Sequence, residues 1–324
     1  MHSVTTEYFT QVMLSRRLLR IKALRALYSH FKSESDSLAV SEKNLLFSID
    51  KTYELYHQML WLVIEVAGYA ENRIELGRRK HLPTPEERNP NTKFIDNRVI
   101  ARIRTSENLT KYIETRHLGW VQHPEAIKNL YNSMVESDYY KEYMSSKESS
   151  FREDLKLVED FYLNEVDDND DLEAILESQS IMWAADMDFS LVMVMRTLSE
   201  MREQQETLRL LPEYKNNDDR EFVRDLFRNS IIHHDEYFEY IDRFTKNWDV
   251  ERIAFMDNLI MSAAMAEFLN LPTIPIKVTL DEYIELAKYY STPGSSTFIN
   301  GILDKIVGEL RNEGRINKTG RGLL

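Results

Sequence analysis

Residues 248–305 read WDVERIAFMDNLIMSAAMAEFLNLPTIPIKVTLDEYIELAKYYSTPGSSTFINGILDK. This stretch decides the fold class, because its apolar side chains recur at steps of three and four, the spacing of a helix that buries one face. Proline breaks it near residue 272, and a Ser/Thr/Pro/Gly loop breaks it again at 291–297. We therefore predict three helices here, over residues 249–269, 280–290 and 297–313.

The apolar positions of these helices define an expected core. In the last helix Phe298, Ile302, Ile306 and Leu310 step by about one turn each and should form a buried stripe. Six side chains should be buried together: Ile253, Ile260, Phe268, Phe298, Ile302 and Ile306.

Local signals predict how these helices begin and where one of them is tightly packed. Thr279 and Glu282 have the spacing of a capping box, and Ser295 or Ser296 could cap the last helix. Gly301 costs about 1 kcal/mol relative to alanine inside a helix. We therefore expect it at a close contact with another helix or with an RNA backbone.

The rest of the chain also favours helices. Only 9 glycines and 8 prolines occur in 324 residues, and no long strand-like alternation is present. The predicted fold class is all-α. Further helices are predicted over residues 11–32, 42–77, 93–117, 124–147, 150–165, 171–208 and 220–243.

Composition narrows the class of protein. The absence of cysteine excludes disulfides and thiolate metal sites and suits a reducing cytoplasm. The longest apolar stretch, residues 59–67, is broken by Glu65 and is too short to span a membrane. The net charge of −13 argues against nonspecific nucleic-acid binding. Basic residues nevertheless gather near the start of the chain: Arg16, Arg17, Arg20, Lys22, Arg25 and Lys32.

No pattern indicates catalysis or a metal site. There is no glycine-rich phosphate loop and no nucleophile with a base. His233 and His234 are adjacent, so on a helix they point about 100° apart and do not ligate one ion easily. The acidic run at 167–171 lacks the glycine and the glutamate of a calcium loop. We predict a protein that is not an enzyme and holds no metal or cofactor.

Several of these pieces together resemble one family. The basic helix RRLLRIKALRALY (residues 16–28) is followed, far along the chain, by W-x3-R-I-x3-D, by I-P-x-x-V with E-x-I-E-L-A-K, and by F-I-N-G-I-L-D. In order and spacing they resemble the NusB family of transcription antitermination factors. About a third of the chain carries the resemblance, which implies a compact all-α domain.

The resemblance implies two kinds of contact. Arg16, Arg17 and Arg20 would bind RNA, since guanidinium groups contact phosphates and stack on unpaired bases, and Asn300 and Lys305 would border the same surface. Tyr28 and Asp257 would meet NusE, a ribosomal protein of the small subunit. The alternative for each is structural: a solvated helix face for the arginines, and core packing for Tyr28.

The chain also departs from the family pattern. Asn258 and Ser262 stand where the family usually has basic residues, so RNA contact there would be weaker. A replacement cluster is present in the middle of the chain: Arg78, Arg79, Lys80, Arg98, Arg102 and Arg104. The expected organisation is a basic N-terminal helix of the NusB-like domain, an inserted helical region, a C-terminal NusB-like bundle and a basic flexible tail, at residues 1–32, 33–215, 216–313 and 314–324.

Two functions follow as hypotheses. The first is a noncatalytic, cytoplasmic antitermination factor that acts with NusE on the boxA element of nascent ribosomal RNA, in the RNA polymerase antitermination complex. The second is a protein-interaction scaffold whose NusB-like core has lost RNA binding. An RNA methyltransferase with a NusB-like domain would need an α/β cofactor domain, of which the sequence gives no sign.

Overall fold

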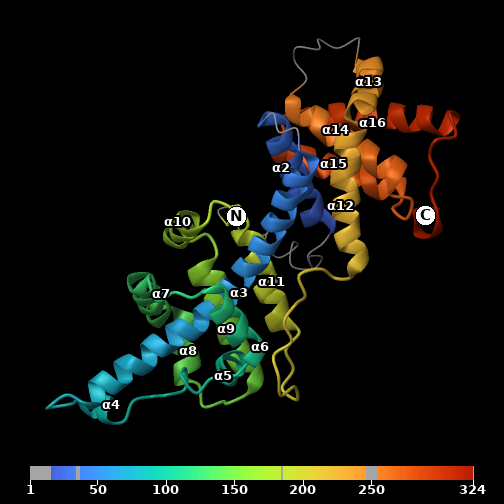
Figure 1. Cartoon of the computed structure of the whole chain (residues 1–324). Coiled ribbons are helices and arrows are strands. Elements are labelled where there is room, and N and C mark those ends of the chain that lie inside the picture. Colours follow the sequence, from blue (N-terminus) through green and yellow to red (C-terminus); the bar gives the residue numbers. More distant parts are fainter. Residues whose placement is uncertain (1–15, 34–36, 184, 246–253, 324) are drawn as a thin grey trace. The chain divides into compact units, whose positions relative to one another are not determined.

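The computed structural model describes residues 16–33, 37–183, 185–245 and 254–323, and within those ranges it is helical and contains no strand (Figure 1). The all-α prediction is confirmed. The helices are α2 (Arg16–Lys32), α3 (Leu38–Arg78), α4 (Pro85–Arg88), α5 (Arg98–Arg104), α6 (Glu107–Arg116), α7 (Pro124–Glu136), α8 (Asp138–Ser145), α9 (Phe151–Phe161), α10 (Asp170–Gln179), α11 (Met187–Ser199), α12 (Asn217–Ile232), α13 (His234–Thr245), α14 (Phe255–Asn270), α15 (Ile276–Tyr290) and α16 (Ser295–Asn312). No helix in the described ranges is long and apolar enough to cross a bilayer.

The helices mostly lie where the sequence predicted them, but several predicted helices are interrupted. The segments predicted as single helices over 93–117, 124–147, 171–208 and 220–243 each hold two helices. At the second break Ser137 ends α7, and its side chain caps α8 by accepting a hydrogen bond from the backbone N–H of Tyr140. Such caps compete with helix continuation, whereas hydrophobic periodicity runs through them.

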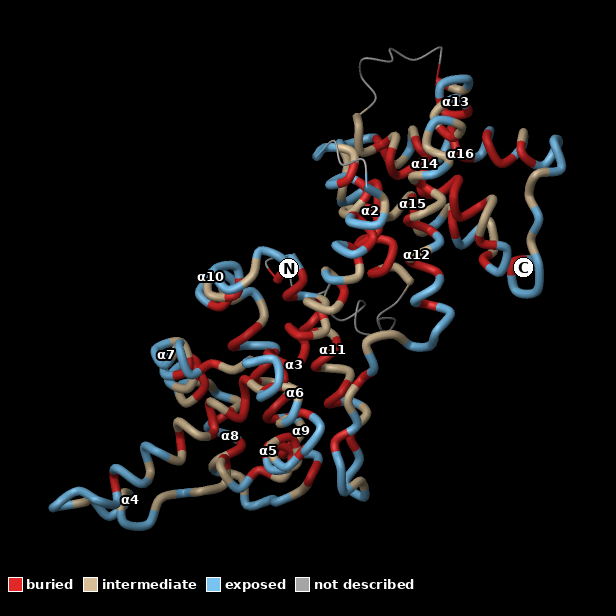
Figure 2. The backbone as a smooth tube through the Cα atoms, in the orientation of Figure 1, coloured by how far each residue is buried: buried red, intermediate tan, exposed pale blue. Residues whose placement is uncertain are grey.

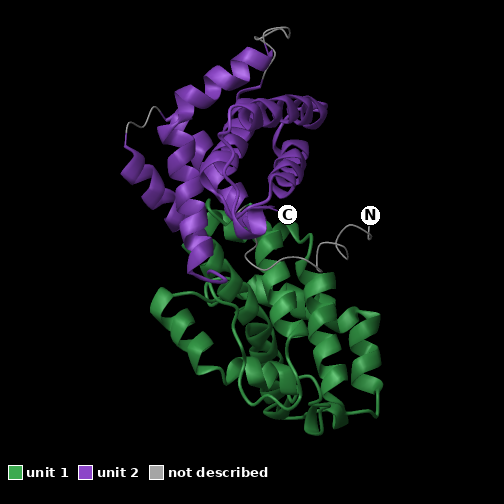
Figure 3. Cartoon of the chain, turned by 90° about the vertical axis from the view of Figure 1, so that its right-hand side faces the viewer, with its two compact units in different colours: residues 1–13, 50–213 green, residues 14–49, 214–324 purple. Residues whose placement is uncertain are grey.

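The described residues divide into two compact units (Figure 3). Unit 1 covers residues 50–213, so it lies within the region expected to be inserted. In it, α9 packs against α5, α8 and α11. Unit 2 combines the start of the described chain with its end, residues 16–49 and 214–323. The helices of unit 2 are α2, the first part of α3, and α12 to α16.

Helix α14 forms the centre of unit 2. It packs against α2, α12, α13, α15 and α16, and it is buried almost all round, as the red tube in Figure 2 shows. Its apolar run has no polar face, which is the pattern of a helix enclosed by others. The two predicted core positions on α14, Ile260 and Phe268, are buried.

The core face of α16 also follows the prediction for the most part. Ile302, Ile306 and Leu310 are buried. Phe298 is only half-buried, because the buried stripe begins instead at Ile299. The remaining predicted core residue, Ile253, lies outside the described residues.

The end of the chain is docked, which corrects the expected flexible tail. The backbone N–H of Thr319 donates to the carbonyl of Pro272 at 3.0 Å. Gly322 is buried against the same carbonyl, and a Cβ on Gly322 would lie 2.0 Å from that oxygen. Only glycine permits this approach. The ammonium of Lys318 donates to the carbonyls of Glu267 and Leu271, at 3.1 and 3.0 Å, and so caps the C-terminal end of α14.

Truncation of Ile302 tests the α16 core. Ile302→Ala removes a fully buried side chain, so it should lower the free energy of unfolding by about 2–5 kcal/mol. The matched control is Gly301→Ala on the same helix, where nothing lies within 4 Å of the new Cβ; it should raise stability by up to about 1 kcal/mol. Urea denaturation measures both. Equal effects of the two substitutions would contradict this packing.

The docked tail predicts a pH effect on stability. Burial lowers the pKa of Lys318 from its ordinary 10.5 to about 8. Between these values the unfolded chain binds a proton that the folded chain does not, so this residue's contribution to stability should rise as pH increases from about 8 to 10.5. The stability difference between wild type and Lys318→Gln, followed by urea denaturation across that range, should therefore grow. A constant difference would refute the assignment.

Candidate nucleic-acid interface

Arg20, the last arginine of the predicted RNA-binding cluster, points into the protein. Only 3% of its surface is exposed. Its guanidinium makes a two-pronged ion pair with Glu267 of α14, with Nε 2.8 Å from Oε2 and Nη2 2.7 Å from Oε1. The expectation that Arg20 lies on the exposed surface is therefore wrong. The physical reason is that α14 supplies a buried carboxylate on the side of α2 that carries Arg20.

The buried carboxylate of Glu267 is the hub of a polar network. The hydroxyl of Thr279 donates to Oε1 at 2.7 Å, and the hydroxyl of Tyr283 donates to Oε2 at 3.3 Å. Burial alone would lower the pKa of Arg20, but the charge and hydrogen bonds of Glu267 raise it above its ordinary value. Burial, reinforced by the charge of Glu267, raises the pKa of Tyr283 well above 10. Arg20 therefore stays charged and Tyr283 neutral.

Arg16 and Arg17 occupy the rim of this network. Their side chains are 36% and 35% exposed. Nε of Arg16 donates to Asp219 of α12 at 2.9 Å, and Nε of Arg17 donates to Glu282 of α15 at 2.9 Å. The ring of Phe222 contacts two guanidiniums, with its centroid 5.1 Å from that of Arg16 and 5.2 Å from that of Arg20. Both contacts are cation–π interactions between a guanidinium and the aromatic ring.

Sequence reasoning missed the carboxylates that pair with the arginines. Glu267 is the one acid in the apolar run at residues 259–269, and a single acid in such a run signals a buried partner of opposite charge. The predicted capping box is wrong, because α15 begins at Ile276 with Pro275 as its N-cap. Thr279 and Glu282 therefore do not cap α15. Thr279 donates a hydrogen bond to Glu267, and Glu282 accepts one from Arg17.

The two residues expected to meet NusE differ in accessibility. Tyr28 is 40% exposed and packs edge-on against Phe255, with ring centroids 5.7 Å apart. The ammonium of Lys32 lies 4.5 Å from the Phe255 centroid. These three residues form a half-open aromatic surface.

Asp257, in contrast, is buried, which corrects the expectation that it is accessible. It accepts hydrogen bonds from the hydroxyls of Ser291 and Ser295, the second at 3.0 Å. Ser295 therefore does not cap α16 as predicted; the N-cap is Gly294, whose φ of 93° suits glycine. The role of Asp257 that the structure supports is to hold the loop before α16.

Asn300 and Lys305 are exposed on α16. Gly301 is exposed as well, and no described residue lies within 4 Å of a Cβ placed on it. The expected close helix contact at Gly301 is therefore absent. Asn258 is half-buried, and Ser262 is buried on α14, so a basic side chain at 262 would not reach the surface without rearrangement.

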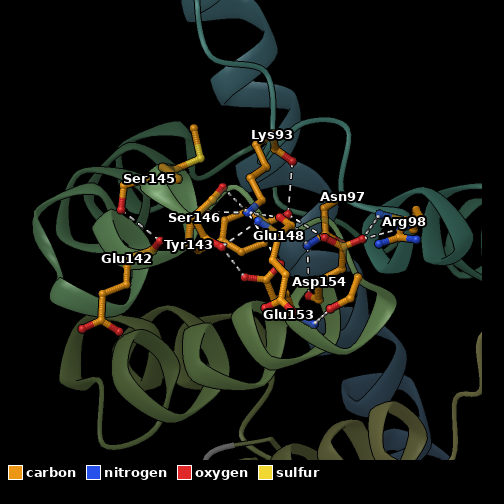
Figure 4. Close-up of polar contacts among 12 residues, drawn as sticks. Lys93, Asn97, Arg98, Glu142, Tyr143, Ser145, Ser146, Glu148, Glu153 and Asp154 are labelled. Atoms are coloured by element: carbon orange, nitrogen blue, oxygen red, sulfur yellow. Dashed lines mark hydrogen bonds and ion pairs between the residues drawn. The ribbon is translucent and has the colours of Figure 1, made fainter.

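The arginines of the middle region are occupied within unit 1. Arg98 binds Asp154 of α9 through Nε at 2.7 Å, beside the cage of backbone carbonyls around Lys93 (Figure 4). Arg104 binds Glu71 at 2.6 Å. Arg102 donates to the backbone carbonyls of residues 202 and 203. Arg79 and Lys80 pair with glutamates as well. Most of the proposed replacement cluster thus ties helices and loops together.

No metal-binding arrangement of three or more His, Cys, Asp or Glu occurs in the part of the chain that the structure describes. His233 and His234 instead contact Glu236 and Asp235.

Comparison with known proteins identifies the region around this site. Residues 189–308 match the model of the NusB family. The chain is similar to the transcription antitermination protein NusB of Salinibacter ruber, with 45% identity over 105 residues, 32% of this chain and 66% of that protein. The corresponding proteins of Chloroherpeton thalassium and Thermodesulfovibrio yellowstonii are 42% and 38% identical, each over 97 residues, covering 46% and 64% of their lengths. The chain thus aligns with less than two thirds of each relative. No solved structure matches.

The buried ion pair can be tested through stability. Arg20→Met leaves the carboxylate of Glu267 buried without its cation, which should cost about 3–5 kcal/mol. The double variant Arg20→Met/Glu267→Met removes both charges and should recover much of that loss. The control is Arg17→Met, at the half-exposed rim, which should cost no more than about 1 kcal/mol. Guanidinium denaturation gives all three values. If Arg20→Met were as mild as Arg17→Met, the network would not hold α2 in place.

Proposed function

We propose, from the premise that this chain carries a NusB-family domain over residues 189–308, that it is a noncatalytic RNA-binding factor of transcription antitermination. Similar proteins of three organisms are named transcription antitermination proteins. By this proposal the protein acts with NusE on boxA RNA, as part of the antitermination complex of RNA polymerase, in the cytoplasm.

One observation carries the proposal. The arginine helix α2 lies far outside the residues that match the family model, yet it packs against α12 and α14, which lie inside them. The arginine cluster and the matched helices α12 to α16 therefore belong to one unit, and residues 50–213 interrupt that unit in sequence. This is the arrangement that the resemblance to the family implied.

The proposed RNA surface begins at the start of α2. Arg16 and Arg17 retain about a third of their side-chain surface in solvent, and they would exchange part of their contact with Asp219 and Glu282 for RNA phosphates. Arg20 would act as a positioning residue. Asn300 and Lys305 on α16 would add contacts. Since carboxylates already neutralise the arginines, RNA binding by the chain alone should be weak.

The proposed partner surface centres on Tyr28. Together with Phe255 it offers an aromatic face, with the ammonium of Lys32 beside it, and aromatic residues are enriched in protein interfaces. Asp257 would support this contact indirectly, through the loop before α16. A basic ribosomal protein such as NusE would add phosphate contacts and so tighten RNA binding.

The scaffold function remains the second proposal, and a specific observation favours it. Arg16, Arg17 and Arg20 all pair with carboxylates of their own unit. Under that hypothesis the arginines serve only to assemble the helices, and the protein partner binds without RNA.

Salt-dependent RNA binding separates the two functions. Arg16→Gln/Arg17→Gln should reduce the slope of log K against log salt by about 1.4, because each lost phosphate contact with single-stranded RNA removes about 0.7. The probe is boxA-containing single-stranded RNA, with and without NusE. Arg152→Gln/Arg209→Gln, two exposed arginines of unit 1, makes the same change in net charge and should leave the slope unchanged. The scaffold would be favoured if the wild type bound no RNA, or if Arg16→Gln/Arg17→Gln bound boxA RNA with the wild-type affinity and slope.

A further inference from the structure

A second group of arginines in unit 2 lies apart from the arginine cluster of α2. Glu42 of α3, whose side chain is 9% exposed, accepts hydrogen bonds from two arginines of α12. Nε of Arg224 lies 2.7 Å from Oε1, and Nε of Arg228 lies 2.8 Å from Oε2. We call Glu42, Arg224 and Arg228 the arginine fork.

The charges of the arginine fork do not balance. Burial would raise the pKa of Glu42, but the hydrogen bonds and charges of the two arginines lower it, so the carboxylate is ionised. Within the fork one carboxylate serves two guanidiniums, so one guanidinium has no hydrogen-bonded carboxylate of its own. The side chains of Arg224 and Arg228 stay 37% and 42% exposed. The Nη groups of Arg224 have no partner among the described residues.

The geometry of the fork suits a phosphate. Two planar guanidiniums, one helical turn apart, are held by the same buried carboxylate, so their orientation is set before a ligand arrives. Guanidinium N–H groups pair with phosphate oxygens in this planar manner. Exposed Glu221 and Asp225 on the same helix also act on Arg224. They weaken the field at a distance, so the site favours direct contact over long-range attraction.

We propose that the arginine fork binds a phosphodiester of the RNA backbone, as a contact additional to those of α2. The proposal rests on the proposed RNA-binding function. Two observations make RNA the ligand that fits: α12 lies within the residues matched by the NusB family, and it packs directly against α2. A single RNA strand that contacts both the start of α2 and the arginine fork would then lie on unit 2 alone.

The test is the salt dependence of binding to single-stranded RNA by the full chain. Arg224→Gln/Arg228→Gln should reduce the slope by about 0.7 and weaken binding about fivefold at 0.1 M salt, the loss of one phosphate contact. Arg152→Gln/Arg209→Gln is the matched control. Arg224→Lys/Arg228→Lys keeps the charge and removes the planar N–H groups, so it should recover only part of the RNA affinity. Because it keeps both positive charges beside Glu42, it also controls for a folding defect in the glutamine variant.

Glu42→Gln distinguishes a built site from general electrostatics. The substitution makes the protein more positive by one charge, so simple attraction predicts tighter RNA binding. Loss of the carboxylate that orients both arginines predicts weaker binding, which is the result we expect. Tighter binding by this variant would overturn the proposal.

The remaining outcomes are also decisive. If wild type binds RNA through Arg16 and Arg17, and the Arg224/Arg228 variants keep its slope, this inference fails while the proposed function stands. If wild type binds no RNA, with or without NusE, the proposed function itself fails. Inorganic phosphate, titrated at constant ionic strength, is the second probe. Thermal stabilisation of wild type by phosphate but not of Arg224→Gln/Arg228→Gln, without any change in the RNA slope, would show a free-phosphate site instead.

Discussion

The buried ion pair between Arg20 and Glu267 is the interaction on which the NusB-like unit depends. It joins α2 to α14, two helices separated by most of the chain. Burying two charges costs several kcal/mol per ion, and their attraction offsets that cost only when the geometry and the additional hydrogen bonds are good. The two-pronged contact and the hydroxyls of Thr279 and Tyr283 meet both conditions. A buried polar network of this kind specifies one position for α2 on the unit.

That position decides which arginines of α2 reach solvent. With Arg20 turned toward α14, exposure increases toward the beginning of the helix, where Arg16 and Arg17 pair with carboxylates at the rim. The three arginines look alike in the sequence, but in the structure Arg16 and Arg17 are partly exposed and Arg20 is buried. Arg20 is committed to assembly, whereas the two earlier arginines keep part of their surface for a ligand.

The sequence predicted the fold class and most of the core, since periodicity alone places Ile260, Phe268, Ile302 and Ile306 on inward faces. It failed where a side chain's surroundings come from distant segments. Asp257 looked accessible, but Ser291 after α15 and Ser295 at the start of α16 bind its carboxylate, and it is buried. Gly301 suggested a close contact, yet it faces open space. Helix spacing shows which residues share a face; it does not show what covers that face.

The number of carboxylates around each arginine distinguishes arginines that only hold the structure together from those that can bind a phosphate. Arg20 is held in the interior by its two-pronged contact with Glu267, and Glu282 lies 3.7 Å away as a second carboxylate. Arg16 and Arg17 pair with Asp219 and Glu282 at the rim, so a phosphate must compete with an existing partner. The fork of Arg224 and Arg228 differs, because two guanidiniums share the single carboxylate of Glu42 and remain partly exposed. The same pairing that orients both arginines leaves one guanidinium without a hydrogen-bonded carboxylate of its own. Because Glu221 and Asp225 weaken the field around Arg224, RNA would be held there by direct pairing with a phosphate and not by a basic surface.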